Sequence, residues 1–184
     1  PAALVVGLFL LLSSSASAAQ QDEGAASGGP DLRTAPWPAQ WIAPPDVDGQ
    51  AFGVYHFRRT LTLDAPVDAF VVHTSGDNRY QLFVNGRRVR IGPARGEVAH
   101  WRYETTDLAP YLEEGPNVIA AVVWNFGKHR PHAQISHETG FLLQGDGPQA
   151  EQINTDAEWR TTTNPAYEPI PRREWSIDGY LVVG

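Results

Sequence analysis

The sequence contains no cysteine and no methionine among its 184 residues. A small exported domain without cysteine has no disulfides to stabilise it, so its fold depends on a hydrophobic core. The absence of cysteine is more typical of bacterial exported proteins than of animal extracellular modules. Because the chain also lacks a starting methionine, we expect that Pro1 is not the true start of the protein.

Positive charge is scarce. Fourteen Lys and Arg residues stand against twenty-one Asp and Glu residues, so the formal net charge is −7 at pH 7. Nucleic acids and anionic membranes attract basic surfaces, and this charge balance argues against both as partners. A neutral ligand such as a sugar is compatible with it.

Long apolar runs are missing too, because no run reaches the roughly 20 residues that a membrane-spanning helix needs. Residues 1–19 carry no charge and combine a short apolar stretch (2–12) with the small residues Ala16-Ser17-Ala18. This is typical of a secretory signal peptide whose basic first part is missing. We predict an exported, periplasmic or extracellular bacterial protein without a membrane span. Residues 20–35, rich in small and polar residues, predict a flexible linker.

Short β-strands dominate the remainder, which begins with large apolar residues at Trp37. The pair Asn85-Gly86 favours a type I′ turn and predicts a hairpin. The apolar stretch 117–124 predicts a central strand that is buried on both faces. The expected strands are 54–61, 69–74, 80–84, 87–91, 117–124, 140–144 and 179–183, with a weaker one at 159–163.

One segment has a helical pattern instead. Thr106 or Asp107 is suited to cap a helix start, and Gly115 is suited to end it, which predicts one short helical turn. With many short strands and no alternation of strands and helices, the sequence predicts an all-β fold, a β-sandwich of the jelly-roll type, over residues 36–171. Residues 172–184 are interpreted as the start of a connection to a further domain, in a chain that we expect to be truncated.

No pair of carboxylates has the character of a glycosidase site, which needs two such groups facing each other across a sugar. Asp77 is expected to be a turn residue and Asp107 a helix cap. His129, His132 and His137 lie in one loop, but their spacing matches no zinc motif, and the neighbouring Lys128 and Arg130 would repel a cation. We therefore predict no catalytic residue, no metal and no cofactor, while a structural calcium ion stays open.

Aromatic side chains can stack on sugars, and Trp101 and Trp124 both lie at loop positions suited to this. Buried aromatics with polar rims fit an interface between domains equally well, and this alternative is favoured over direct sugar contact. Trp37 and Trp41 are expected to be packing residues. The candidates for carbohydrate or interdomain contact are Trp101, Arg95, Trp124, Asn125, His129, Arg130 and His132.

A set of motifs extends over most of the chain after the linker. They are Pro36-Trp37-Pro38-Ala39-Gln40-Trp41-Ile42, Val123-Trp124-Asn125-Phe126-Gly127 and the segments 57–59, 77–86, 92–96, 101–108, 115–120, 133–136 and 140–146. In these motifs the chain resembles the N-terminal sandwich region of bacterial α-L-rhamnosidases. The hairpin and the 107–117 segment also recur in the galactose-binding-like sandwiches of β-galactosidases, β-glucuronidases and β-mannosidases.

This resemblance implies an inverting glycoside hydrolase whose catalytic glutamates lie in a later (α/α)₆ barrel, outside this chain. No catalytic position is therefore carried over. The first hypothesis is the non-catalytic sandwich of a rhamnoside-hydrolysing enzyme, which packs against that missing barrel. Two alternatives stay open, a carbohydrate-binding module and the front domain of a β-galactosidase-like enzyme.

Overall fold

The computed structural model describes residue 32 and residues 34–169. The predicted signal peptide, most of the predicted linker, the predicted connection from residue 172 onward and the predicted strand at 179–183 lie outside this part of the chain. Among the described residues, no helix combines the length and the apolar character that crossing a membrane requires.

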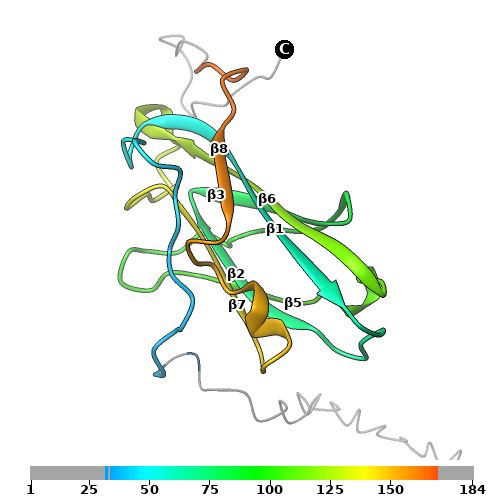
Figure 1. Cartoon of the computed structure of the whole chain (residues 1–184). Coiled ribbons are helices and arrows are strands. Elements are labelled where there is room, and N and C mark those ends of the chain that lie inside the picture. Colours follow the sequence, from blue (N-terminus) through cyan, green and yellow to red (C-terminus); the bar gives the residue numbers. More distant parts are fainter. Residues whose placement is uncertain (1–31, 33, 170–184) are drawn as a thin grey trace, which may run out of the picture.

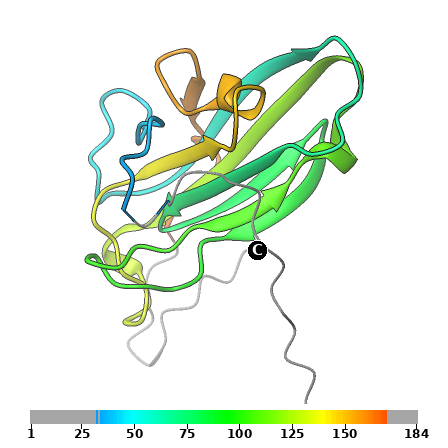
Figure 2. The ribbon, with the colours of Figure 1, turned by 90° about the horizontal axis from the view of Figure 1, so that it is seen from below.

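The described chain forms two antiparallel sheets that stack face to face (Figures 1 and 2). The five-stranded sheet has the order β4-β3-β6-β1-β8, and the three-stranded sheet has the order β5-β2-β7. The predicted all-β sandwich is confirmed. The strands are β1 (Phe52–Leu63), β2 (Val71–Asp77), β3 (Arg79–Val84), β4 (Arg87–Gly92), β5 (Glu104–Asp107), β6 (Gly115–Phe126), β7 (Gly140–Gly145) and β8 (Arg160–Thr163).

The hairpin between β3 and β4 turns at Asn85 and Gly86, whose φ angles of 50° and 79° are those of a type I′ turn. The Asn85 side chain also accepts a hydrogen bond from the Val118 amide (2.9 Å) and donates one to Asn117 Oδ1 (2.8 Å). The predicted hairpin is confirmed, and its tip is tied to the start of β6.

The predicted helical turn is the 3₁₀ helix η1 (Ala109–Tyr111). Asp107 Oδ1 accepts hydrogen bonds from the amides of Ala109 (3.0 Å) and Phe70 (2.9 Å), so it links this turn to the start of β2. Thr106 and Asp107 themselves belong to β5, a strand that the sequence pattern did not predict. Two further 3₁₀ helices, η2 (Gly127–His129) and η3 (Ala150–Ile153), were also not predicted.

Strand β6 is central in its sheet, but it is buried on one face only, so this prediction was wrong. Ile119, Ala121 and Val123 point into the core, while Val122 and Trp124 on the other face are half-buried. The reason is that no second layer of described residues covers the outer face of the five-stranded sheet. The strand that is buried throughout is β7, because it has the core on one side and the segment before β1 on the other.

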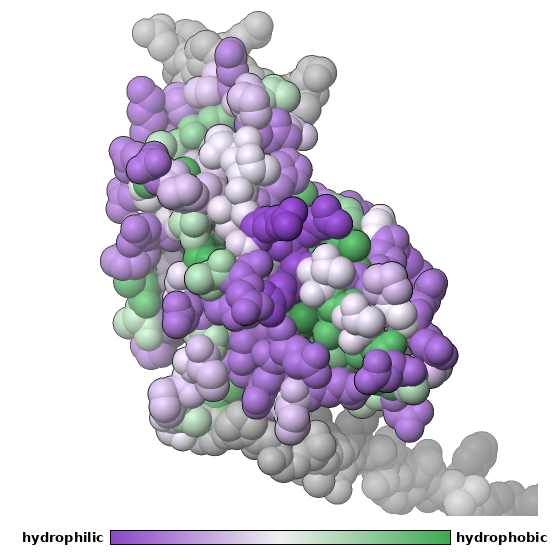
Figure 3. Space-filling view, in the orientation of Figure 1, coloured by the Kyte–Doolittle hydropathy of each residue, from purple (hydrophilic) through white to green (hydrophobic). Residues whose placement is uncertain are grey.

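The core lies between the sheets and is centred on aromatic rings. Phe141 in β7 packs at centroid distances of 5.3 Å from Phe57, 5.6 Å from Trp159 and 6.0 Å from Tyr80. Hydrophilic residues dominate the face seen in Figure 3, as expected when the large apolar groups are packed inside. Both sheets therefore depend on one shared core.

Candidate functional site

The outer face of the three-stranded sheet is covered by two segments from distant parts of the chain. Residues 34–43 run beside β7, where Ile42 and Phe141 exchange two backbone hydrogen bonds of 3.0 and 2.9 Å (Figure 2). The loop between β4 and β5 is joined to β2 through Ser75, whose hydroxyl donates to the carbonyl of Arg102 (2.7 Å). Residues far apart in the sequence therefore meet on this face.

Four aromatic residues form a layer there, which we call the aromatic layer: Trp37, Trp41, Trp101 and Tyr103. Trp37 and Tyr103 meet edge to face at 5.1 Å, and Trp41 and Trp101 meet at 6.2 Å with their ring planes 86° apart. The indole nitrogen of Trp101 donates to Ser75 Oγ (3.0 Å), which fixes the orientation of this ring. Trp101 is thus a positioned surface group and not a mobile one.

Trp41 was expected to be a packing residue, and this expectation was wrong, because 48% of it is exposed. Its backbone adjoins the pairing of Ile42 with β7, so the side chain projects from the outer face of the sandwich and not into the core. One edge of the indole lies against Gly140, where an added Cβ atom would come within 2.9 Å of the ring. Glycine at this position lets the ring lie directly on the strand.

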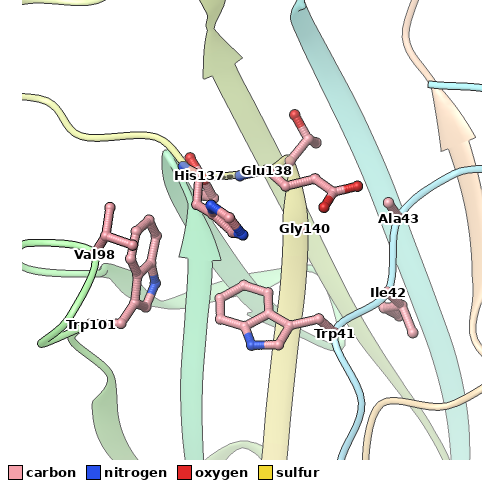
Figure 4. Close-up of a pocket in the computed structure, with 10 residues that line it drawn as sticks. Trp41, Ile42, Ala43, Val98, Trp101, His137, Glu138 and Gly140 are labelled. Atoms are coloured by element: carbon pink, nitrogen blue, oxygen red, sulfur yellow. Dashed lines mark hydrogen bonds between the residues drawn. The ribbon is translucent and has the colours of Figure 1, made fainter. Parts of the chain in front are cut away.

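Trp41 and Trp101 border a cleft of about 450 Å³, which we call the aromatic cleft (Figure 4). Figure 4 shows the two indole rings near one another, with His137 and Glu138 above Trp41. A second, wider cleft adjoins the same tryptophan pair on the side of Trp37 and Tyr103. The lining of the aromatic cleft is Trp41, Ile42, Ala43, Asp77, Val98, Trp101, His137, Glu138, Thr139 and Gly140.

Asp77 holds the loop that borders the cleft. It is 1% exposed, and its Oδ2 atom accepts hydrogen bonds from the amides of His137 (2.6 Å) and Glu138 (2.8 Å). The expectation that Asp77 is merely a turn residue was wrong, because it anchors the segment from η2 to β7. Its engaged carboxylate positions His137 and Glu138 at the cleft.

The side chains of His137 and Glu138 differ from Asp77 in that no hydrogen bond joins them to another described residue. Both are exposed at the rim of the cleft. The lining contains no Lys and no Arg. The cleft therefore offers apolar ring surface, an acidic acceptor and an imidazole, and it carries no positive charge from lysine or arginine.

The structure brings Arg95 close to this region, because it lines a small pocket that shares Trp101 with the aromatic cleft. Asn125, in contrast, is buried and unavailable to a ligand. Its Nδ2 atom donates to Ser136 Oγ (3.1 Å) and Thr139 Oγ1 (3.0 Å), and its Oδ1 atom accepts from the Gly127 amide (2.8 Å). The prediction that Asn125 contacts a carbohydrate or another domain was therefore wrong, because its side-chain amide holds the loop before β7.

The other candidates lie outside the cleft. Trp124 is on the outer face of the opposite sheet, and Arg130 donates to the carbonyl of Gly127 (3.3 Å). His129 is half-buried and His132 exposed, in the loop after β6. Within residues 34–169, no three histidine or acidic side chains come together as a possible metal site.

His73 lies beneath the aromatic layer, with ring centroids at 6.1 Å from Trp37 and 5.7 Å from Tyr103. Its Nδ1 atom pairs with Thr105 Oγ1 (2.9 Å), while Nε2 is buried without a hydrogen bond, 3.7 Å from Asp146. Burial lowers the pKa of His73 below its ordinary value, and the Asp146 carboxylate partly opposes this shift. The ring is therefore neutral at pH 7 and packs as an aromatic group.

Comparison with known proteins gives matches among solved structures, whereas no protein-family model and no curated protein matches the chain. A GH78 family rhamnosidase of Bacillus sp. GL1 superposes with a TM-score of 0.61 and 27% identity, covering 69% of this chain and 13% of that one. An α-L-rhamnosidase from Dictyoglumus thermophilum gives a TM-score of 0.54 and 18% identity, covering 70% of this chain and 17% of its own.

A third match is the Streptomyces avermitilis α-L-rhamnosidase complexed with L-rhamnose, with a TM-score of 0.52 and 21% identity. It covers 73% of this chain and 14% of that one. The second and third matches show a shared fold, and the first adds a closer sequence likeness. The chain spans about 13–17% of the length of these enzymes and is a domain related to part of a glycoside hydrolase.

Proposed function

We propose that this chain is the non-catalytic N-terminal sandwich of an exported α-L-rhamnosidase, which hydrolyses terminal α-L-rhamnose from glycosides. The observation that carries the proposal is the partial match to the GH78 rhamnosidase, which involves most of this chain and a small part of the enzyme. The motifs that carry the sequence resemblance include Asn125 and Gln134, whose side-chain amides donate buried hydrogen bonds to Thr139 Oγ1 and to the carbonyl of Asn78 and so hold the loop before β7.

The role proposed for the sandwich is to support the catalytic part by packing against it. We assign this contact to the outer face of the five-stranded sheet, where β6 presents an apolar stripe that no described residue layer covers. The stripe consists of Val118, Ala120, Val122, Trp124 and Phe126. Contact between apolar side chains and water is unfavourable, so covering this face with another domain lowers the free energy of the protein.

The activity is tested by comparing the 184-residue chain with a longer protein that includes the downstream coding region. With p-nitrophenyl α-L-rhamnopyranoside as substrate, we expect hydrolysis by the longer protein only. Release of arabinose or galactose instead of rhamnose by the longer protein would exclude the assignment. So would rhamnoside cleavage by the 184-residue chain that depends on its own carboxylates.

The packing role is tested with Val122→Glu, which puts a charge in the apolar stripe. The 184-residue chain should still fold, because this side chain lies on the outer face, whereas the longer protein should lose thermal stability and activity. Ala157→Glu, at an exposed loop position, is the matched control and should change neither protein. Equal effects of the two substitutions on the longer protein would place the contact elsewhere.

A further inference from the structure

We infer that the outer face of the five-stranded sheet binds an acidic surface of the downstream catalytic part, through arginines that lie on both sides of the apolar stripe. This inference rests on the packing role proposed above and specifies the chemistry of the partner. The chain carries a net charge of −7, yet the five strands of this sheet contain no Asp, Glu or Lys, and every strand but β6 contains arginine. A basic face on an acidic domain is complementary to a partner surface that carries carboxylates.

A single row of residues that lie opposite one another crosses this face from edge to edge. Arg160 in β8 is opposite Arg58 in β1, and Arg58 is in turn opposite Ala120 in β6. On the other side of Ala120 the row continues with Phe83 in β3 and ends with Arg88 in β4. Residues directly opposite each other point to the same side of a sheet. The row therefore has an apolar centre, which belongs to the stripe, and positive charge at both ends.

Arg58 and Arg160 are an unfavourable pair within this domain, because like charges directly opposite each other destabilise a sheet. Both side chains are exposed, and no hydrogen bond or ion pair joins either of them to another described residue. Arg59, the next residue of β1, is paired inside the domain with Asp156 (3.5 Å) and Glu158 (2.5 Å). The carboxylates near this edge are thus engaged by Arg59, and the charge of the Arg58–Arg160 pair is left for a carboxylate from outside.

The two arginines border an open cleft of about 470 Å³, which also touches Arg59, Thr60 and Glu158. Guanidinium groups bind carboxylates through two parallel hydrogen bonds and are less strongly hydrated than ammonium groups, so arginine suits ion pairs at interfaces. Protein interfaces combine an apolar centre with a polar rim and are enriched in arginine. Binding of nucleic acid depends mainly on contacts to phosphates. The apolar centre of the row therefore favours a protein surface as the partner.

The partner is identified by zero-length crosslinking of the longer protein. Arg58→Lys and Arg160→Lys, made separately, keep the positive charge and supply a primary amine that a carbodiimide joins to a carboxylate in contact with it. Lys128 is the single lysine of the 184-residue chain, so mass spectrometry can assign a product at either position. In the monomer fraction we expect a crosslink to an Asp or Glu of the downstream part. Arg102→Lys, at an exposed position in the loop between β4 and β5, is the matched control and should give none.

Arg160→Glu separates docking from folding, because its effects on the two proteins have opposite signs. In the 184-residue chain it replaces a like-charge pair with an opposite-charge pair, so the thermal midpoint should rise by about 1–3 °C. In the longer protein the new carboxylate faces the carboxylates of the partner, so the midpoint should fall, and ~0.5 M salt should reduce the fall by screening. Replacing the crosslinked carboxylate with arginine should restore the midpoint. Arg102→Glu should shift neither midpoint by more than about 1 °C.

The inference is overturned if neither lysine variant crosslinks to the downstream part, if crosslinks join only separate molecules, or if Arg160→Glu shifts both midpoints in the same direction. None of these measurements uses a glycoside. A crosslink in a longer protein that does not hydrolyse rhamnosides would support this contact and exclude the enzyme assignment. Destabilisation of the longer protein by Val122→Glu without any crosslink would support the apolar contact and exclude the arginines.

Discussion

Buried polar side chains hold the loop beside the aromatic cleft in place through hydrogen bonds. The side-chain amide of Asn125 both donates and accepts hydrogen bonds, and the Asp77 carboxylate accepts hydrogen bonds from two backbone amides. These bonds replace the hydrogen bonds to water that the loop loses on burial. His73 fills an aromatic position beneath Trp37 and Tyr103. Function at this surface is therefore assigned to the exposed residues that these groups position.

Asp77→Ala should release the loop that borders the cleft. The amides of His137 and Glu138 would lose a buried charged acceptor, and such losses cost about 1–3 kcal/mol each. Hydrogen exchange should become faster at these two amides, and the free energy of unfolding should fall. Asp64→Ala, at an exposed position, is the control. Unchanged exchange in Asp77→Ala would show that the loop is held by other contacts.

His73 should make stability depend on pH in one direction. Its pKa is lowered in the folded state, so the unfolded chain binds more protons as the pH falls through about 6.5. Stability should therefore decrease between about pH 7.5 and 5.5, by at most about 1.4 kcal/mol per pH unit from this group, and level off below the folded pKa. Above about pH 7.5, His73 makes no contribution to the pH dependence of the free energy of unfolding.

The measurement is denaturant unfolding of His73→Asn and the parent chain over this pH range. The substituted chain should show a weaker loss of stability in acid. His132→Asn, which changes an exposed histidine, should keep the parent profile. A steeper acid loss in His73→Asn than in the parent would contradict the assignment, because it would mean that the Asp146 carboxylate outweighs the effect of burial on His73.

At the scale of elements, short-range signals coincide with the observed strands. The β3–β4 hairpin follows from Asn85-Gly86, and β1 alternates so that Phe57 and Leu61 point into the core. Twelve consecutive residue pairs then join β1 to β6, from Phe52 opposite Phe126 to Leu63 opposite Gly115. This long register makes the two strands the framework on which the five-stranded sheet is built.

Gly86→Ala should destabilise the hairpin between β3 and β4. The φ angle of 79° is costly for any residue with a Cβ atom, and no other group crowds the position, so the expected loss is about 1 kcal/mol from backbone strain alone. Gly86→Asn is the matched comparison and should lose less, because asparagine tolerates positive φ. Thermal unfolding measures both, and equal losses would contradict the turn geometry.

At the scale of the whole molecule, the two sheets share one hydrophobic core. Phe141 from the small sheet contacts Phe57 and Tyr80 from the large one, and Trp159 near the edge. Neither sheet can keep its inner face dry without the other. The described chain is therefore expected to unfold as one cooperative unit.

Phe141→Ala should lower the free energy of unfolding by about 3–5 kcal/mol, because it leaves a cavity at the point where both sheets meet. Calorimetry should still show a single transition. Tyr167→Ala, at a residue that is 50% exposed, should change stability by no more than about 0.5 kcal/mol. Two separate transitions in Phe141→Ala would show that the sheets fold independently.

The sequence predicted most strands because the signals are local: alternation of side chains, apolar runs and the Asn-Gly turn. It missed β5, whose short polar stretch Glu104–Asp107 becomes a strand only by pairing with β2. It also assigned full burial to β6 and not to β7. Apolar composition cannot distinguish these two cases, since burial of the second face depends on which distant segment covers it.

The sequence by itself determined the strand-rich fold class, the hairpin and the helical turn after β5, since neighbouring residues decide those features. Tertiary structure alone decided the candidate site. Trp41, Trp101 and Glu138 come from three separate segments, and they meet because backbone pairing with β7, the Ser75 hydroxyl and the Asp77 carboxylate bring those segments to one face. No local pattern specifies such contacts, because each depends on partners far away along the chain.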